Sequence, residues 1–275
     1  MSTNSEWYNV AVTQYLLHST SSGKGQQTVV LLHGYLSSSQ YFKHIRKRLE
    51  EEYRVVALDL LGFGRSPKPR IDYMYDDHIA AIHYTLDQLG IKRPYVLLGH
   101  SMGALIALRY ATVHGDDISK LLLFNPPLFT DRSQMIGTHR ATGRRYRIML
   151  YSRGRHIYWL VLRLLPKNKS LRRSAISFSD TISMSPAARE GSYRHVIGAA
   201  TVFSDLRRVT VPTLLVNGRH DRVVYLENLQ GRRLPALVTL SIIESGHHPL
   251  VRNVDMSNDL IQSFLCKKAE KPVRD

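Results

Sequence analysis

Residues 96–105 read Val-Leu-Leu-Gly-His-Ser-Met-Gly-Ala-Leu, and they place Ser101 between an apolar run and a segment rich in Ala and Leu. The run at 94–98 has the length of a buried strand, and 102–114 has the composition of a helix. A G-x-S-x-G pattern needs small residues at 99 and 103, because the serine backbone is strained and the helix packs close beneath it. The stretch therefore predicts a sharp strand-to-helix turn that holds the Ser101 hydroxyl clear of a sheet.

Outward from this turn, apolar runs of strand length alternate with helical patterns. The predicted strands are 28–32, 54–58, 95–98, 120–124, 213–216 and 238–243, and the predicted helices are 38–50, 75–89, 102–114 and 255–264. We expect these strands to be buried and parallel. Residues 8–17 are predicted to add one or two strands, followed by a turn at 19–25. The alternation predicts an α/β fold with a doubly wound, mostly parallel sheet.

The alternation stops after Asn125-Pro126-Pro127 and resumes near Val211-Pro212. The intervening stretch of roughly eighty residues has helical but no clear strand character, and it is too long for a loop. We interpret it as a helical cap inserted into the sheet domain. The expected organisation is a first part of the core at 1–126, a strongly basic helical cap at 127–205, and a second part of the core at 206–275.

The net charge of +16 belongs largely to the predicted cap, because residues 132–173 contain twelve Lys or Arg and no Asp or Glu. Such a surface could bind anionic lipid or an acidic substrate. It could equally be a solvated face that only maintains solubility. Within it, the apolar stretch 157–162 includes Tyr158 and Trp159 and has basic flanks, which allows peripheral contact with an anionic membrane. Packing of this stretch onto the core is the favoured interpretation. No nucleic-acid recognition motif is present, so no specific nucleic-acid partner is expected.

The sequence has no motif that indicates a cofactor and no segment that indicates a membrane span. The single cysteine, Cys266, excludes an internal disulfide, and no Cys and His cluster has the spacing of a zinc site. Residues 1–10 lack the basic and apolar regions of a secretory signal, and no apolar run approaches the roughly 20 residues of a membrane span. We expect a cytoplasmic protein that can contact a membrane peripherally, with no metal and no organic cofactor.

Further motifs follow the predicted strands. Asp221 ends Asn-Gly-Arg-His-Asp at 217–221, and His247 lies in Ser-Gly-His-His-Pro at 245–249. A Leu-Leu-His-Gly-Tyr segment occupies 31–35, and a D-x-x-G-x-G-x-S loop occupies 59–66. In order and setting, these motifs and the serine turn resemble the α/β-hydrolase superfamily over nearly the whole chain outside the cap. The loop at 59–66 is interpreted as a structural turn, since its glycine spacing fits neither a P-loop nor a dinucleotide fingerprint.

The resemblance implies a catalytic triad. Ser101 would be the nucleophile, His247 the base and then the acid, and Asp221 the carboxylate that orients the imidazole. The backbone N–H groups of Tyr35 and Met102 would form the oxyanion hole. The Tyr35 side chain could line the pocket or be buried against the cap.

Neighbouring histidines leave some assignments open. His248 adjoins His247, but register after Gly246 favours His247 as the base. His220 is taken as structural. His100 is also expected to be structural. His100, Tyr158 and Trp159 are in addition the candidate substrate-binding residues.

The leading interpretation is a serine hydrolase that cleaves carboxylic esters, including lipid-like or acyl-glycerol esters, with a small-molecule ester as its partner. A serine at 101 disfavours haloalkane dehalogenases and epoxide hydrolases, which use aspartate there. Fold fixes neither the bond nor the substrate, so two alternatives stand. One is a C–C bond hydrolase of meta-cleavage-type diketo acids. The other is a noncatalytic ligand receptor or membrane-binding module on the same fold.

Overall fold

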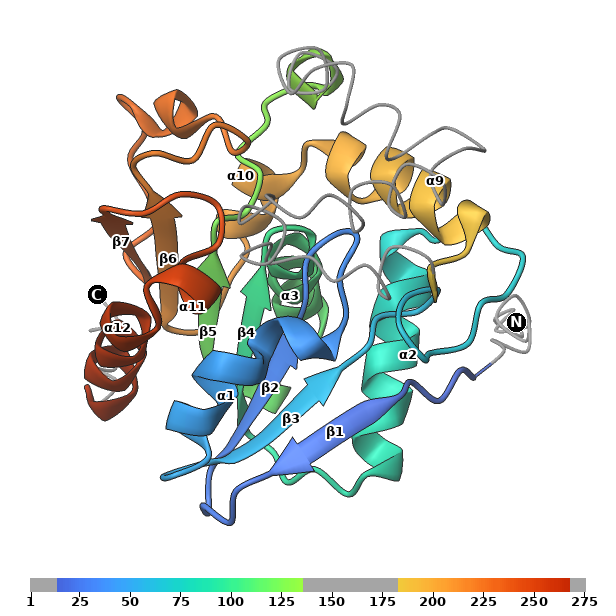
Figure 1. The fold of residues 1–275 in the computed structure, drawn as a ribbon. Helices are drawn as coiled ribbons and strands as arrows, with labels where there is room; N and C mark the ends of the chain where they lie inside the picture. Colours follow the sequence, from blue (N-terminus) through green and yellow to red (C-terminus); the bar gives the residue numbers. More distant parts are fainter. Residues whose placement is uncertain (1–13, 136–182, 268–275) are drawn as a thin grey trace, which may run out of the picture.

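A computed structural model describes residues 14–135 and 183–267 of the chain. Its seven strands form one sheet in the order β1-β3-β2-β4-β5-β6-β7 (Figure 1). They are β1 (Ser19–Ser22), β2 (Thr28–Leu32), β3 (Arg54–Leu58), β4 (Tyr95–His100), β5 (Ile118–Phe124), β6 (Thr213–Gly218) and β7 (Val238–Ile243). β1 is antiparallel to β3, and the other neighbouring pairs are parallel. The predicted α/β class with a mostly parallel sheet is confirmed.

Helices connect these strands. The α-helices are α1 (Lys43–Leu49), α2 (Tyr75–Gln88), α3 (Met102–Val113), α9 (Pro186–His195), α10 (Val202–Leu206), α11 (Pro249–Arg252) and α12 (Val254–Cys266). Short 3-10 turns are η1 (Ser39–Phe42), η2 (Gly115–Asp117), η3 (Ile197–Ala199) and η4 (Leu226–Leu229). Within the described ranges, no helix is long and apolar enough to cross a bilayer.

The two faces of the sheet are buried in separate apolar clusters. Alternate residues of one strand point to opposite faces, so Val29 and Leu31 join one cluster while Val30 and Leu32 join the other. The cluster with Val29 and Leu31 contains side chains of α1 and α12, and the cluster with Val30 and Leu32 contains side chains of α2, α3, α9 and α10. Helices on both faces make the sheet doubly wound.

The strand ends differ from the sequence prediction in a consistent way. β4 and β6 continue past their apolar runs, because Gly99 and His100 pair with β5, and Asn217 and Gly218 pair with β7. Hydropathy alone does not mark these residues as strand. They carry the sheet up to the segments that hold the candidate site.

Two predictions about the sheet edges are wrong. Residues 19–25 were expected to form a turn, but Ser19–Ser22 form β1, whose polar side chains suit a partly exposed edge. Residues 14–17 form no strand, and 8–13 lie outside the described residues. At the other edge, β7 is not buried throughout, since Leu240 and Ile242 are exposed and only Val238 and Ile243 are buried.

Of the predicted cap at 127–205, residues 136–182 lie outside the described residues. The remainder contains α9, η3 and α10, and no strand occurs in 127–135 or 183–205. α9 and α10 lie beyond the carboxyl ends of the central strands (Figure 1). The Arg109 guanidinium of α3 contacts the Tyr75 ring, and its Nε donates to Asp205 of α10 at 3.0 Å. The domain boundaries proposed from sequence stay a prediction.

A buried lysine closes the end of α12. The Nζ of Lys120, in β5, donates to the carbonyl oxygens of Phe264, Leu265 and Lys267 at 2.8, 2.7 and 2.6 Å. The last carbonyls of a helix have no partners inside the helix, so an ammonium group there satisfies several of them and complements the helix dipole.

We predict that Lys120→Met lowers the free energy of unfolding by about 2 kcal/mol, because the side-chain volume is kept while the charged hydrogen bonds are lost. Urea unfolding measures this change. The matched control is Lys92→Met at an exposed lysine, which should stay within about 0.5 kcal/mol of wild type. Equal losses in the two variants would contradict the assigned role of Lys120.

A second prediction concerns His78, which is fully buried on α2 and joins α9 through a 3.1 Å contact between its Nε2 and Ser192 Oγ. Burial, with a smaller contribution from His33, lowers the pKa of His78 to about 3. In the unfolded chain this pKa is about 6.5. Between the two values only the unfolded chain binds the proton, so the stability present above pH ~6.5 is lost as pH falls.

His78→Gln removes the titrating group and keeps an amide that can reach Ser192. The loss of unfolding free energy between pH 7 and pH 5 should then be smaller than in wild type by about 2 kcal/mol. Urea titrations at the two pH values test this, with exposed His44→Gln as control. The assignment fails if His78→Gln and wild type lose the same amount.

Candidate active site

Ser101 occupies a strained turn between β4 and α3, with φ 53° and ψ −118°. Its backbone N–H donates to the Phe124 carbonyl at 2.8 Å, which ties the turn to β5. A Cβ at Gly99 would lie 2.3 Å from the Gly103 carbonyl oxygen, and one at Gly103 would lie 2.3 Å from the Leu32 oxygen. Only glycine fits either position, so the motif acts here as the sequence predicted.

The structure brings Ser101, His247 and Asp221 together from the ends of three strands. His247 Nε2 lies 3.0 Å from Ser101 Oγ, and His247 Nδ1 lies 2.7 Å from Asp221 Oδ2. Because a carboxylate only accepts, Nδ1 carries the proton and Nε2 is left to accept from the serine hydroxyl. This is the hydrogen-bonded chain that activates a serine nucleophile.

The surroundings of Asp221 keep it ionised. Burial alone favours the neutral carboxyl, but hydrogen bonds from His247, from the Val223 backbone and from Asn125 outweigh it and hold the pKa of Asp221 below its usual range. The Val223 N–H reaches Oδ1 at 2.8 Å, and Asn125 Nδ2 reaches Oδ2 at 2.6 Å. A charged carboxylate at this position stabilises the imidazolium that forms when the base takes a proton.

Asn125 is a site residue that the sequence analysis missed. The available signal is its position directly after the predicted strand 120–124, because α/β sheets place functional groups at the carboxyl ends of their strands. Its backbone is left-handed, with φ 50°, and its amide also lies 3.4 Å from the Gly246 carbonyl. Asn125 thus bridges the segments that carry Asp221 and His247.

The loop after β2 lies against the nucleophile. A Cβ at Gly34 would be 3.1 Å from Ser101 Cβ, so the chain at Gly34 passes close to the nucleophile. Tyr35 is the next residue along this loop. Met102 is the first residue of α3, and amides of a first helical turn have no acceptor inside the helix. The assignment of the Tyr35 and Met102 backbone N–H groups as oxyanion donors stays a prediction. The Tyr35 side chain packs toward the cap, where its hydroxyl donates to the Arg189 carbonyl at 2.9 Å.

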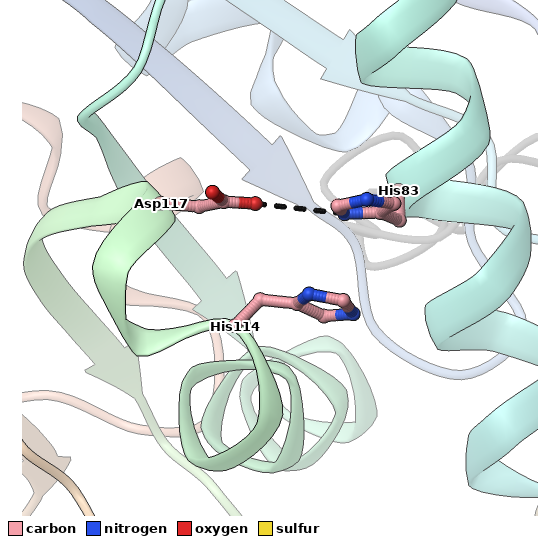
Figure 2. Close-up of side chains that lie close together, drawn as sticks. All are labelled: His83, His114 and Asp117. Atoms are coloured by element: carbon pink, nitrogen blue, oxygen red, sulfur yellow. Dashed lines mark ion pairs between the residues drawn. The ribbon is translucent and has the colours of Figure 1, made fainter.

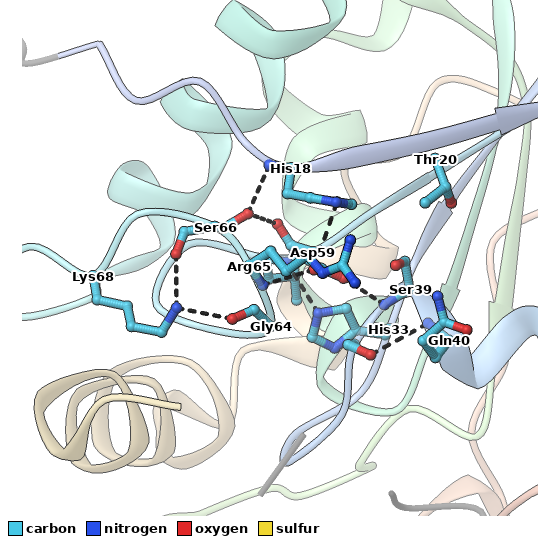
Figure 3. A network of polar contacts seen from close by, with 12 residues as sticks. His18, Thr20, His33, Ser39, Gln40, Asp59, Gly64, Arg65, Ser66 and Lys68 are labelled. Carbon is cyan, nitrogen blue, oxygen red and sulfur yellow. Dashed lines mark hydrogen bonds and ion pairs between the residues drawn. The ribbon is translucent and has the colours of Figure 1, made fainter. Parts of the chain in front are cut away.

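The loop at 59–66 supports this region through a network of polar contacts (Figure 3). Asp59 accepts from the backbone N–H groups of Ser39 and Arg65 at 2.6 and 2.8 Å. Burial raises the pKa of Asp59, but these hydrogen bonds and nearby His33 bring it below its usual value. His33 Nδ1 donates to the Gly34 carbonyl, and its Nε2 accepts from the Leu60 N–H. These bonds hold the loop at 59–66 against the segments that follow β2.

The histidines near the triad have separate roles. His100 is 2% exposed, its Nε2 donates to the His247 carbonyl at 2.7 Å, and its ring stacks on Tyr41. It therefore positions the segment of the base, as expected of a structural residue, and its candidate role as a substrate contact stays a prediction. Burial lowers the pKa of His248 to about 3. His220 is exposed and pairs with Glu244.

The other two candidate substrate contacts, Tyr158 and Trp159, lie outside the described residues. Their assignment stays a prediction.

We predict that Asn125→Asp lowers kcat/KM for the substrate by about tenfold to a thousandfold, less than the roughly 10⁴-fold effect of altering a triad carboxylate itself. The variant tolerates the left-handed backbone, but it places a second carboxylate against Asp221, and two such groups compete for one proton. Steady-state kinetics measure the change, with exposed Gln88→Glu as the charge control. Wild-type kcat/KM in Asn125→Asp would show that the bond to Asp221 is dispensable.

Comparison with known proteins agrees with this geometry. A family model described as the alpha/beta hydrolase fold matches residues 27–253. The chain is 29% identical over 262 residues to an uncharacterized hydrolase, YugF, of Bacillus subtilis (strain 168), covering 88% of this chain and 90% of the relative. It is 39% identical over 114 residues to the probable lysophospholipase BODYGUARD 4 of Arabidopsis thaliana, covering 38% of this chain and only 25% of that protein.

Among solved structures, the enol-lactonase from Burkholderia xenovorans LB400 is similar with a TM-score of 0.73 and 19% identity, over 91% of this chain and 96% of that one. At this identity the likeness concerns the fold. The sheet order, the strained serine turn and the family match over most of the chain lead to one conclusion: the chain belongs to the α/β-hydrolase family.

Proposed function

We propose that the protein is a serine hydrolase that cleaves carboxylic esters through an acyl-enzyme. The observation that carries this proposal is the hydrogen-bonded chain from Ser101 Oγ to His247 Nε2 at 3.0 Å, and from His247 Nδ1 to Asp221 Oδ2 at 2.7 Å. A serine held on a strained turn, with an imidazole nitrogen in reach of its hydroxyl and a carboxylate behind that imidazole, is the arrangement required for acyl transfer.

In the first half of the reaction, Ser101 Oγ attacks the ester carbonyl carbon while its proton passes to His247 Nε2. Asp221 stabilises the resulting imidazolium, and the N–H groups of Tyr35 and Met102 stabilise the oxyanion. The tetrahedral intermediate then breaks its bond to the leaving alkoxide, which takes the proton from His247. The alcohol departs and the acyl group stays on Ser101.

In the second half, water attacks the acyl carbon and gives its proton to His247. The second tetrahedral intermediate collapses, Ser101 Oγ recovers the proton, and the carboxylic acid leaves. Each step uses only water and the side chains and amides named above.

We further propose a lipid-like ester, such as an acyl-glycerol ester, as the substrate. The support is the basic and partly apolar sequence of the predicted cap, which suits a substrate with a long chain and an anionic or interfacial part. The name of the Arabidopsis relative points in the same direction for that protein. Peripheral contact of the cap with an anionic membrane is part of this proposal.

A C–C bond hydrolase would use the same three residues, so the triad geometry does not favour one bond over the other. The relative rates of ester and diketo-acid hydrolysis distinguish the two reactions. An esterase turns over simple esters much faster than a diketo acid, and a C–C hydrolase shows the reverse. The noncatalytic alternative predicts ligand binding that is unaffected by Ser101→Ala.

The test is hydrolysis of p-nitrophenyl esters from acetate to palmitate, with fluorophosphonate labelling in parallel. Ser101→Ala should lose labelling and reduce kcat by about 10³-fold or more, because the variant keeps the fold and loses the nucleophile. Exposed Ser204→Ala is the matched control and should match wild type. Faster turnover of long chains than of acetate would support a lipid-like substrate.

Labelling without turnover of any ester would leave the triad competent and overturn the ester assignment, and a diketo acid would be assayed next. Absence of both labelling and turnover would overturn the hydrolase proposal.

A further inference from the structure

A second group of chemically capable side chains lies far from Ser101. His83 on α2, His114 just after α3 and Asp117 in η2 face one another where β4 and β5 begin (Figure 2). Ser101 follows the opposite end of β4, six residues away along the strand, which separates the two places by roughly 20 Å. The cluster is therefore distinct from the candidate active site, and its role does not depend on the proposed function.

The three side chains can offer ligand atoms to one ion. One such atom from each, an imidazole nitrogen or a carboxylate oxygen, lies within 4.8 Å of the other two. His83 Nδ1 and Asp117 Oδ2 are already 3.5 Å apart. A tetrahedral ion with bonds of ~2.1 Å holds its ligand atoms ~3.4 Å apart, so this pair needs almost no movement.

His114 needs a side-chain rotation to join them. Its ring is stacked on that of His83, with centroids 4.1 Å apart and an angle of 16°, and parallel rings do not aim their nitrogens at one point. All three residues are half-buried, so an ion held between them would be partly shielded from bulk water.

The contacts around the cluster also fit an ion on His83 Nδ1. On its other side, His83 Nε2 lies 3.6 Å from Asp87 Oδ2, so a metal-bound ring would direct its N–H at a carboxylate. Such partners orient metal-binding imidazoles and raise their basicity. Tyr110, whose hydroxyl lies 3.0 Å from Nδ1, also bonds Tyr95 at 2.7 Å and can release His83.

The two carboxylate oxygens of Asp117 have different surroundings. Its Oδ1 accepts from Arg93 Nε at 2.7 Å, which fixes the carboxylate. Its Oδ2 is buried and accepts no hydrogen bond from residues 14–135 or 183–267. A buried carboxylate oxygen that lacks a donor is under-satisfied, and a cation would correct this.

We propose that His83, His114 and Asp117 bind a first-row divalent transition ion, with zinc as the natural probe and water as the remaining ligand. Two imidazoles and one carboxylate suit this class of ion better than Mg²⁺ or Ca²⁺, which prefer oxygen ligands. The bound ion ties α2 to the connection between α3 and β5. This proposal departs from the expectation of no metal, which rested on spacing along the sequence.

Isothermal titration of the full chain with zinc tests the site. We expect one saturable site whose Kd rises by about tenfold or more in Asp117→Asn and in His114→Phe. Asp117→Asn keeps an oxygen for Arg93, and His114→Phe keeps a ring stacked on His83, so both variants retain the contacts that support the fold. Exposed His44→Gln, the matched control, should bind as wild type does.

A second measurement separates this site from the active-site histidines. At one fixed zinc concentration, the melting temperature should rise equally in wild type and in His247→Ala, and should rise less in Asp117→Asn. The proposal is overturned if wild type binds no zinc up to about 1 mM, a Kd that corresponds to only weak association. It is also overturned if Asp117→Asn and His114→Phe bind as tightly as wild type, or if His247→Ala abolishes binding.

Discussion

The close approach of α3 to the end of β2 is the constraint on which the rest of the site depends. Gly103 lies where a single added carbon would strike the carbonyl oxygens of Leu32 and His33. This contact fixes the start of α3 against the loop that carries Tyr35, and it forces Ser101 into a backbone conformation that side chains rarely adopt. The turn is held in this conformation by β5, because the Ser101 N–H donates to the Phe124 carbonyl.

Around this fixed point, four neighbouring strands each contribute one polar group. Ser101 follows β4, Asn125 follows β5, Asp221 follows β6 and His247 follows β7. Because these strands are adjacent and parallel, their ends meet at one edge, and residues over 100 positions apart come within hydrogen-bond distance. Together, the contact with His247 and the hydrogen bonds from the Val223 backbone and Asn125 outweigh the cost of burying the Asp221 charge.

Much of this arrangement could be predicted from the sequence, because apolar runs and glycine motifs are local signals. The ranges of β2, β3 and β7 match the apolar runs at 28–32, 54–58 and 238–243. The polar ends of β4 and β6 and the polar edge strand β1 could not be found this way, since pairing with a neighbour decides them. Asn125 and His100 act through hydrogen bonds to distant segments, which no sequence spacing reveals.

The apolar cluster on the α2 and α3 face does not stop at the sheet domain. Ala188, Val196, Ile197 and Val202 of the predicted cap region belong to the same cluster as Leu97 and Leu123 of the sheet. The described part of the predicted cap region therefore shares one hydrophobic core with the sheet. A substitution at one of these shared core positions would change the packing of the sheet domain as well as any contact that the region makes with a substrate. New specificity would arise more readily in cap residues that do not belong to this shared cluster.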